Sequence, residues 1–135
     1  MTDEAVFEFF DVVNGIWSQA DLAFEVESIV RTAAEEEGGF LTAIQHGERA
    51  GGPVLQALYP SDVLLEDGFN VVFLEDFGPM PPGVYSCTTG VVITARYFGA
   101  RMPMEVPPSV LAHELGHALS LEHVCGETEN LMCAD

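Results

Sequence analysis

Three of the four histidines in this chain lie within eleven consecutive residues, from His113 to His123. Side chains four residues apart on a helix share one face, so His113 and His117 can bind the same metal ion if this segment is helical. His123 follows just past the end of such a helix, where the chain can bend and return the third imidazole to the ion. The fold must therefore supply a helix and then a turn at this point.

The residues around the histidines indicate that helix. Ser109 is a natural N-cap, or Pro108 occupies the first turn, and the predicted helix continues to about Ser120. Its buried stripe consists of apolar residues at helical spacing: Val110, Leu111, Leu115, Ala118 and Leu119. The first two histidines thus lie on a helix that packs against a core.

Glu114 follows His113 directly and lies about 100° around the helix from it. This places the carboxylate beside the ion rather than on it, where a general base can take a proton from metal-activated water. A catalytic zinc ion has three protein ligands and one open position, and it lowers the pKa of its water to about 7. The HExxH spacing therefore predicts one catalytic Zn²⁺ held by His113, His117 and His123, with Glu114 as the base. The alternative is a helix that carries these side chains by accident.

Other potential ligands fit this pattern less well. His46 lies in a glycine-rich region and is expected to be a solvated loop side chain. Glu122, Glu127 and Glu129 are the downstream acids that could replace the third histidine. Such a site normally needs a second helix well beyond the first, and too little chain remains for one. We expect these three glutamates to be solvated.

The cysteines leave two alternatives open. Their number, three, does not suggest a disulfide framework. Cys125 and Cys133 bracket a short C-terminal loop and either form a disulfide that closes it or remain free thiols; a role as extra metal ligands is less favoured. Cys87 has no assignable role and is expected to be a small buried residue.

The charge balance restricts the partners. The chain has 22 acidic and 4 basic residues, a net charge of −18, and no lysine. Such a surface repels nucleic acid and anionic lipid, so we exclude both. It suits either solubility at high salt or selection of neutral and basic peptide substrates. The basic residues are all arginines: Arg31, Arg49, Arg96 and Arg101.

Length and hydropathy indicate one domain spanning residues 1–135, without a transmembrane helix. The N-terminus is acidic, and Glu8 and Asp11 interrupt the first apolar segment, so we expect no signal peptide. A cytoplasmic location is favoured over export by another route. The oligomeric state is left open by the sequence.

The remaining elements predict an α+β fold with one mixed sheet. Apolar residues at helical spacing indicate an amphipathic helix from Asp3 to about Gln19. Runs of alternating or continuous apolar residues predict the strands. The predicted strands are Leu22–Ala33, a short one at Phe40–Ile44, a buried one at Asn70–Glu75, an edge strand at Tyr85–Thr89, and Gly90–Tyr97.

The segment from His113 to His123, with Met132 shortly after it, resembles the metzincin clan of zinc peptidases. The clan's motif is HExxHxxGxxH followed by a methionine-containing turn beneath the metal. The resemblance implies the three histidine ligands, the glutamate base and a Met-turn role for Met132. It also implies a zincin-like domain: a twisted sheet with a backing helix, an active-site helix and an edge strand that pairs with extended substrate. Residues 13–20 look like the first helix of small matrixin-like members.

The chain departs from the clan's pattern in two respects. The motif's glycine is Ser120 here, which costs on the order of 1 kcal/mol if the residue must adopt a left-handed conformation. The sequence also stops at Asp135, three residues after Met132, so the resemblance implies a domain truncated after the Met-turn. Ala134 occupies the position where some members have a tyrosine ligand.

These features together predict a zinc-dependent endopeptidase that acts on peptide or protein substrates. One alternative is a weakly active or inactive zinc-binding interaction module that retains the metal site. Another is a hydrolase of a different amide. Substrate specificity, biological role and any latency mechanism do not follow from the sequence.

Overall fold

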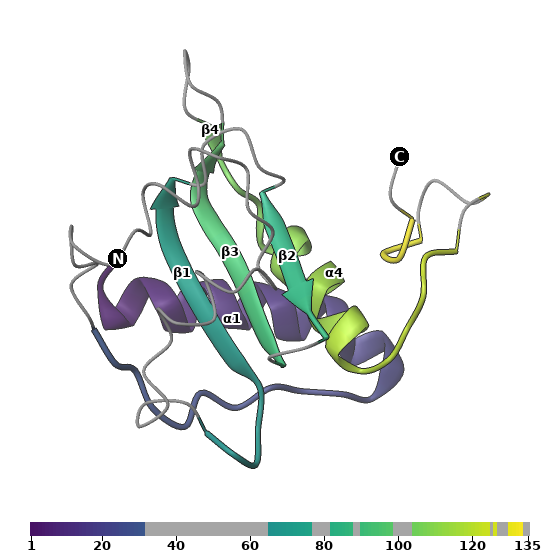
Figure 1. Cartoon of the computed structure of the whole chain (residues 1–135), viewed down its shortest axis with the longest axis horizontal. Coiled ribbons are helices and arrows are strands. Elements are labelled where there is room, and N and C mark those ends of the chain that lie inside the picture. Colours follow the sequence, from purple (N-terminus) through teal and green to yellow (C-terminus); the bar gives the residue numbers. More distant parts are fainter. Residues whose placement is uncertain are drawn as a thin grey trace.

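The computed structural model describes residues 1–31, 65–76, 82–87, 90–98, 104–124, 126 and 130–133. The fold class predicted from the sequence, α+β with a mixed sheet, is confirmed (Figure 1). The helices are α1 (Asp3–Trp17), the 3-10 helix η1 (Ser18–Ala20) and α4 (Pro108–Ala118). The strands are β1 (Asn70–Asp76), β2 (Gly83–Ser86), β3 (Val91–Phe98) and β4 (Met104–Glu105).

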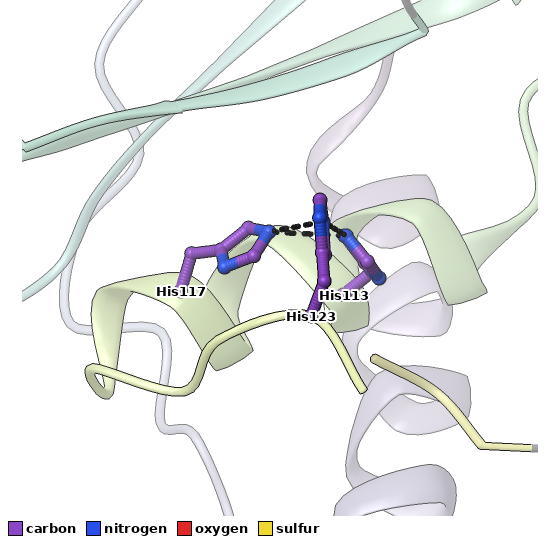
Figure 2. Close-up of side chains that lie close together, drawn as sticks. All are labelled: His113, His117 and His123. Atoms are coloured by element: carbon purple, nitrogen blue, oxygen red, sulfur yellow. Dashed lines mark hydrogen bonds between the residues drawn. The ribbon is translucent and has the colours of Figure 1, made fainter. Parts of the chain in front are cut away.

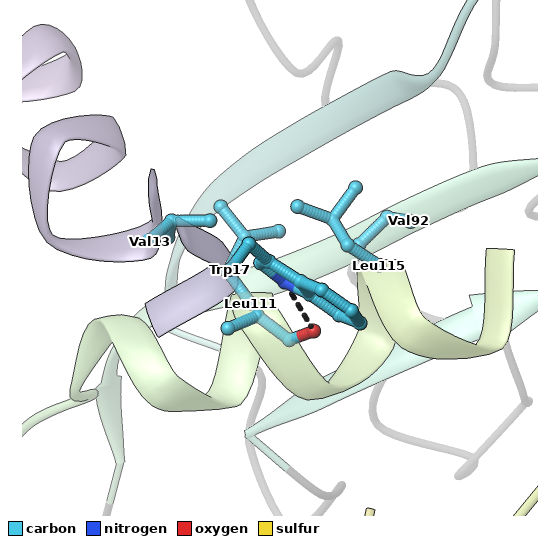
Figure 3. Close-up of a cluster of buried hydrophobic side chains, with 6 residues drawn as sticks. Val13, Trp17, Val92, Leu111 and Leu115 are labelled. Atoms are coloured by element: carbon cyan, nitrogen blue, oxygen red, sulfur yellow. Dashed lines mark hydrogen bonds between the residues drawn. The ribbon is translucent and has the colours of Figure 1, made fainter. Parts of the chain in front are cut away.

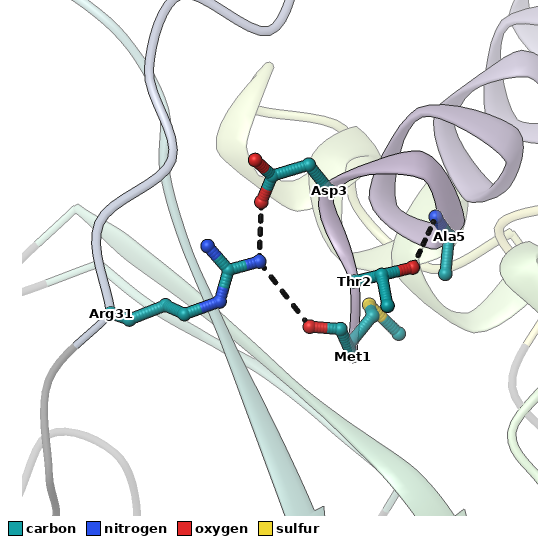
Figure 4. Close-up of polar contacts among 5 residues, drawn as sticks. All are labelled: Met1, Thr2, Asp3, Ala5 and Arg31. Carbon is teal, nitrogen blue, oxygen red and sulfur yellow. Dashed lines mark hydrogen bonds and ion pairs between the residues drawn. The ribbon is translucent and has the colours of Figure 1, made fainter.

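Helix α1 begins at a side-chain cap. The hydroxyl of Thr2 accepts the main-chain N–H of Ala5 at 3.2 Å, which satisfies one of the free donors of the first turn (Figure 4). Arg31 forms an ion pair with Asp3 and lies 3.4 Å from the carbonyl oxygen of Met1. Both charged side chains are more than half exposed, so this pair contributes little to stability.

The sheet has the order β1-β3-β2, and β4 pairs with the far end of β3. Strand β1 is parallel to β3, whereas β2 and β4 are antiparallel to it. The first four residues of β3, Val91 to Thr94, are fully buried because the strand lies at the centre of the sheet. In the described part of the chain, β2 has a neighbouring strand on one side alone.

Both α-helices pack against one face of the sheet, and their contact contains the main core (Figure 3). Val13 and Trp17 of α1 meet Leu111 and Leu115 of α4 over Val92 of β3. The indole Nε1–H of Trp17 donates to the carbonyl oxygen of Ala112 at 3.2 Å. This bond joins α1 to the middle of α4, so the core fixes the helix that carries the first two histidines.

The prediction of a strand at Leu22–Ala33 is wrong for the part that the structure describes, residues 22–31. Side chains hold this segment instead of a neighbouring strand. The amide of Asn14 bonds both main-chain groups of Phe24, at 2.7 Å and 2.9 Å. The Phe24 ring packs edge-on against Trp17 and Phe69. The apolar alternation of residues 22–31 therefore does not correspond to a sheet register.

The other predicted elements have mixed outcomes. The first helix is confirmed as α1, and the late helix as α4, which has Pro108 in its first turn. The strand predicted at Asn70–Glu75 is β1, although residues 71–74 are half-buried and the fully buried strand is β3. The edge strand is present as β2 but begins two residues earlier than predicted. The short strand predicted at Phe40–Ile44 lies outside the described residues.

Neither α-helix in the described residues is long and apolar enough to traverse a lipid bilayer.

Candidate metal centre

The structure brings His113, His117 and His123 together (Figure 2). The Nε2 atom of His113 lies 3.1 Å from that of His117 and 3.1 Å from that of His123, and the third separation is 3.0 Å. The three nitrogens thus form a nearly equilateral triangle. A tetrahedral ion with metal–nitrogen distances of about 2.0–2.1 Å holds its ligand atoms about 3.3–3.4 Å apart. The triangle is within a few tenths of an ångström of that spacing.

Hydrogen bonds on the opposite ring nitrogens set the tautomers of two histidines. His113 Nδ1 lies 2.7 Å from the carbonyl oxygen of Leu131, and His117 Nδ1 lies 2.8 Å from that of Leu121. A carbonyl oxygen only accepts, so both Nδ1 atoms must carry the proton. In the neutral rings, the Nε2 atoms then present lone pairs to each other at 3.1 Å. Two lone pairs at that distance repel unless a cation lies between them, so the donor set fits a metal ion.

The chain reaches His123 through a tight turn at the end of α4. Ser120 adopts the left-handed conformation with φ 67°. Its N–H donates to the His117 carbonyl oxygen, and the Leu121 N–H donates to that of Gly116, both at 2.9 Å. These two bonds form a Schellman motif, in which glycine is the usual left-handed residue. The serine therefore makes the turn that the glycine of the resembled motif would make, and the turn also aims the Leu121 carbonyl at His117.

Met132 lies in a second turn that packs against the helix between the two histidines. Its N–H donates to the side-chain oxygen of Asn130, and its carbonyl oxygen accepts the N–H of Val124 at 3.0 Å. The side chain is buried and covers the Cα of Gly116, where an added methyl group would overlap the sulfur. The turn thus connects Val124, just after His123, to the face of α4 at Gly116.

The side chain of Glu114 reaches the edge strand β2. It is 9 % exposed, and the main-chain N–H of Tyr85 on β2 bonds its carboxylate. Burial raises the pKa of Glu114, and the charges of His113 and His117 and the Tyr85 bond oppose this shift only partly. A buried carboxylate beside the imidazoles of His113 and His117 has the environment of a general base.

His123 is the exposed member of the group. Loss of hydration beside the other rings is the main cause of its lowered pKa, followed by the charges of His117 and His113. A lowered pKa favours the neutral imidazole, which is the form that binds metal.

The other potential metal ligands named from the sequence do not join the histidines. Among the residues that the structure describes, the three histidines are the one group of metal-binding side chains that lie close enough together to hold an ion. Glu122 is exposed and is not part of this group. Cys133 is a half-buried free thiol, and the expectation that Cys87 is buried is wrong because it is exposed. Outside the described residues lie His46, Cys125, Glu127 and Glu129.

Sequence reasoning missed several groups that position the site. The carbonyls of Leu121 and Leu131 belong to the main chain and have no residue-type signal. Gly83 begins β2, and a Cβ there would meet Glu114 and Val110. A glycine within a strand often marks the close approach of another element, but the predicted edge strand begins at Tyr85 and does not include Gly83.

Comparison of the chain with protein-family models, with curated proteins and with solved structures found no match. The geometry of the site therefore carries the functional argument by itself.

Proposed function

We propose that this protein is a zinc-dependent endopeptidase. The observation that carries the proposal is the triangle of Nε2 atoms, 3.0–3.1 Å apart, with a buried carboxylate on the next residue of the same helix. Three imidazoles leave a fourth position of a tetrahedral ion open, as in catalytic rather than structural zinc sites. When bound, zinc supplies Lewis-acid activation of water and of the scissile carbonyl.

The chain's own residues have distinct roles in this proposal. His113, His117 and His123 hold the ion. Glu114 accepts a proton from the attacking water and returns it to the leaving amine. Met132 supports α4 from below, as the resemblance to metzincins implies.

Strand β2 suits an extended peptide substrate. In an antiparallel strand the N–H and C=O of one residue point to the same side. The Tyr85 N–H bonds Glu114 and not β3, so the Tyr85 carbonyl also points away from β3, toward the side that has no neighbouring strand in the described residues. A peptide that adds along this edge would pass beside Glu114. The arrangement therefore supports cleavage of unstructured protein segments over hydrolysis of a small amide.

The test combines metal analysis with cleavage of a peptide library. The protein should bind one zinc ion, and His123→Ala should weaken binding strongly. Glu114→Gln should retain zinc and lose about 10²- to 10⁴-fold in turnover, the usual contribution of a general base. Glu122→Gln is the matched control because it removes the same charge at an exposed position beside His123.

The outcomes separate the competing functions. Stoichiometric zinc without cleavage of any peptide would favour the zinc-stabilised interaction module. Normal turnover in Glu114→Gln would exclude the proposed mechanism.

A further inference from the structure

The space between β2 and α4 leaves no room for a side chain at Gly83. A Cβ built on Gly83 would lie 2.6 Å from Cγ1 of Val110 and 3.0 Å from Cγ of Glu114. It would also lie 3.3 Å from a carboxylate oxygen of Glu114. Real Cβ atoms essentially never approach another heavy atom to 2.6 Å, so a side chain at residue 83 would force α4 or its side chains to move.

The atoms that would move include the carboxylate that Tyr85 holds. Gly83 and Tyr85 are two residues apart on β2, so their Cβ directions lie on the same face of the strand. Tyr85 packs in the core formed with α4 and donates its N–H to Glu114. Strand β2 therefore contacts Glu114 at two points: the main chain of Gly83 lies against its stem, and Tyr85 holds its carboxylate.

We propose that Gly83 is a positioning residue for Glu114: the bare main chain at this position lets α4 approach β2 closely enough for the Tyr85 N–H to fix the carboxylate. The inference rests on the proposed function in that Glu114 is the base. A substitution at Gly83 would act on the base directly, because the added Cβ meets Val110 and Glu114, and no histidine atom is among its three nearest neighbours. A misplacement of about 1 Å can cost about 10²-fold in rate.

A glycine required for packing alone would produce a different result. In that case Gly83→Ala would lower stability, but in the folded fraction the Tyr85–Glu114 bond and the turnover number would remain. The two cases are therefore distinguished by a measurement on the Tyr85 amide and by the separation of kcat from KM.

The experiment compares Gly83→Ala with Gly15→Ala, the same substitution at a glycine whose Cβ would have open space. A third variant combines Gly83→Ala with Val110→Ala and so removes the Val110 methyl group that the new Cβ meets. If it recovers activity, the loss in Gly83→Ala is due to this steric contact and not to misfolding. Val110→Ala alone is its control. Each protein is loaded with Zn²⁺, and zinc affinity is measured by chelator competition. The proton shift and hydrogen exchange of the Tyr85 amide are measured by NMR, with Glu114→Ala as the reference for a lost bond.

We expect the zinc affinity of Gly83→Ala to be within about twofold of that of the parent protein. Its Tyr85 amide proton should exchange with solvent as fast as it does in Glu114→Ala. Its kcat should fall at least tenfold with little change in KM, and the double variant should recover most of both losses. A protected Tyr85 amide and an unchanged kcat in Gly83→Ala would overturn the proposal. If the parent protein cleaves no peptide, the proposed function fails, and the Tyr85 amide still decides whether Gly83 positions Glu114.

Discussion

The Nδ1 atom of His113 lies 2.7 Å from the main-chain carbonyl oxygen of Leu131, eighteen residues further along the chain. This contact links the first histidine of α4 to the turn that contains Met132. Asn130 stabilises this turn, because its side-chain oxygen accepts the Met132 N–H at 2.9 Å. The orientation of His113 therefore depends on a side chain that does not belong to the histidine group.

Asn130→Ala should weaken zinc binding by about tenfold, because the loss of an outer-shell partner usually costs 10- to 100-fold in metal affinity. Chelator competition measures the effect. Asn70→Ala is a suitable control, since Asn70 also holds a turn through its side chain, by contacts to Leu65, but lies away from the histidines. Equal zinc affinity in the two variants would show that the Leu131 carbonyl does not need this turn.

Ser120→Gly should stabilise the protein by up to about 1 kcal/mol, because glycine adopts the left-handed conformation without the steric cost that serine incurs. Urea unfolding of the metal-free protein measures the change. Ser18→Gly should have the opposite effect, since Ser18 has φ −57°, glycine there increases the freedom of the unfolded chain, and the Ser18 hydroxyl bond to the Gly15 carbonyl oxygen is lost. A destabilised Ser120→Gly variant would contradict the assigned turn.

Gly116→Ala should destabilise the protein by about 1–3 kcal/mol, the usual cost of overpacking. The added methyl group would overlap the sulfur of Met132 and would lie 3.5 Å from the Trp17 ring. Gly15→Ala should instead stabilise by up to about 1 kcal/mol, because it replaces a helical glycine that faces open space. Thermal unfolding of both variants checks the difference, and equal effects would show that Met132 can move aside without cost.

Removing the charge of Glu114 should stabilise the metal-free protein in a pH-dependent way. The folded-state pKa of Glu114 is raised above its ordinary value of 4.5, so the folded protein binds this proton more tightly than the unfolded chain does. Stability is then lost as the pH rises from below 4.5 through the folded pKa. Glu114→Gln avoids that loss, so its advantage in unfolding free energy should be largest at neutral pH and should shrink toward pH 4.5. Denaturant titrations at several pH values test this, with Glu122→Gln as the control.

The parts of the fold that follow from local periodicity could be predicted from the sequence. Helices α1 and α4 each present an apolar stripe at helical spacing, and residues four apart necessarily share a face. The approach of His113 to His117 follows from that spacing alone. The position of His123 required more, because it depends on whether Ser120 accepts a left-handed conformation, and the structure shows that it does.

The parts that depend on distant segments could not be predicted. The stretch after Leu22 has the alternation of a strand, but Asn14 on α1 supplies the partner for its main chain. The contact between Gly83 and Glu114 joins residues thirty-one apart in the sequence, and no local pattern encodes that distance. Similarly, the Tyr85 N–H has no residue-type signature, because any residue other than proline would offer the same donor at that position.

The two groups that orient His113 and His117 are peptide oxygens, so the side chains at positions 121 and 131 take no part in aiming the imidazoles. Leucine at either position is therefore interchangeable with other residues as far as the coordination geometry is concerned, provided that the backbone path is kept. A related chain could differ at both sites and still hold the same ion, whereas a proline or an inserted residue in either turn would separate a ring from its acceptor while leaving all three histidines in the sequence.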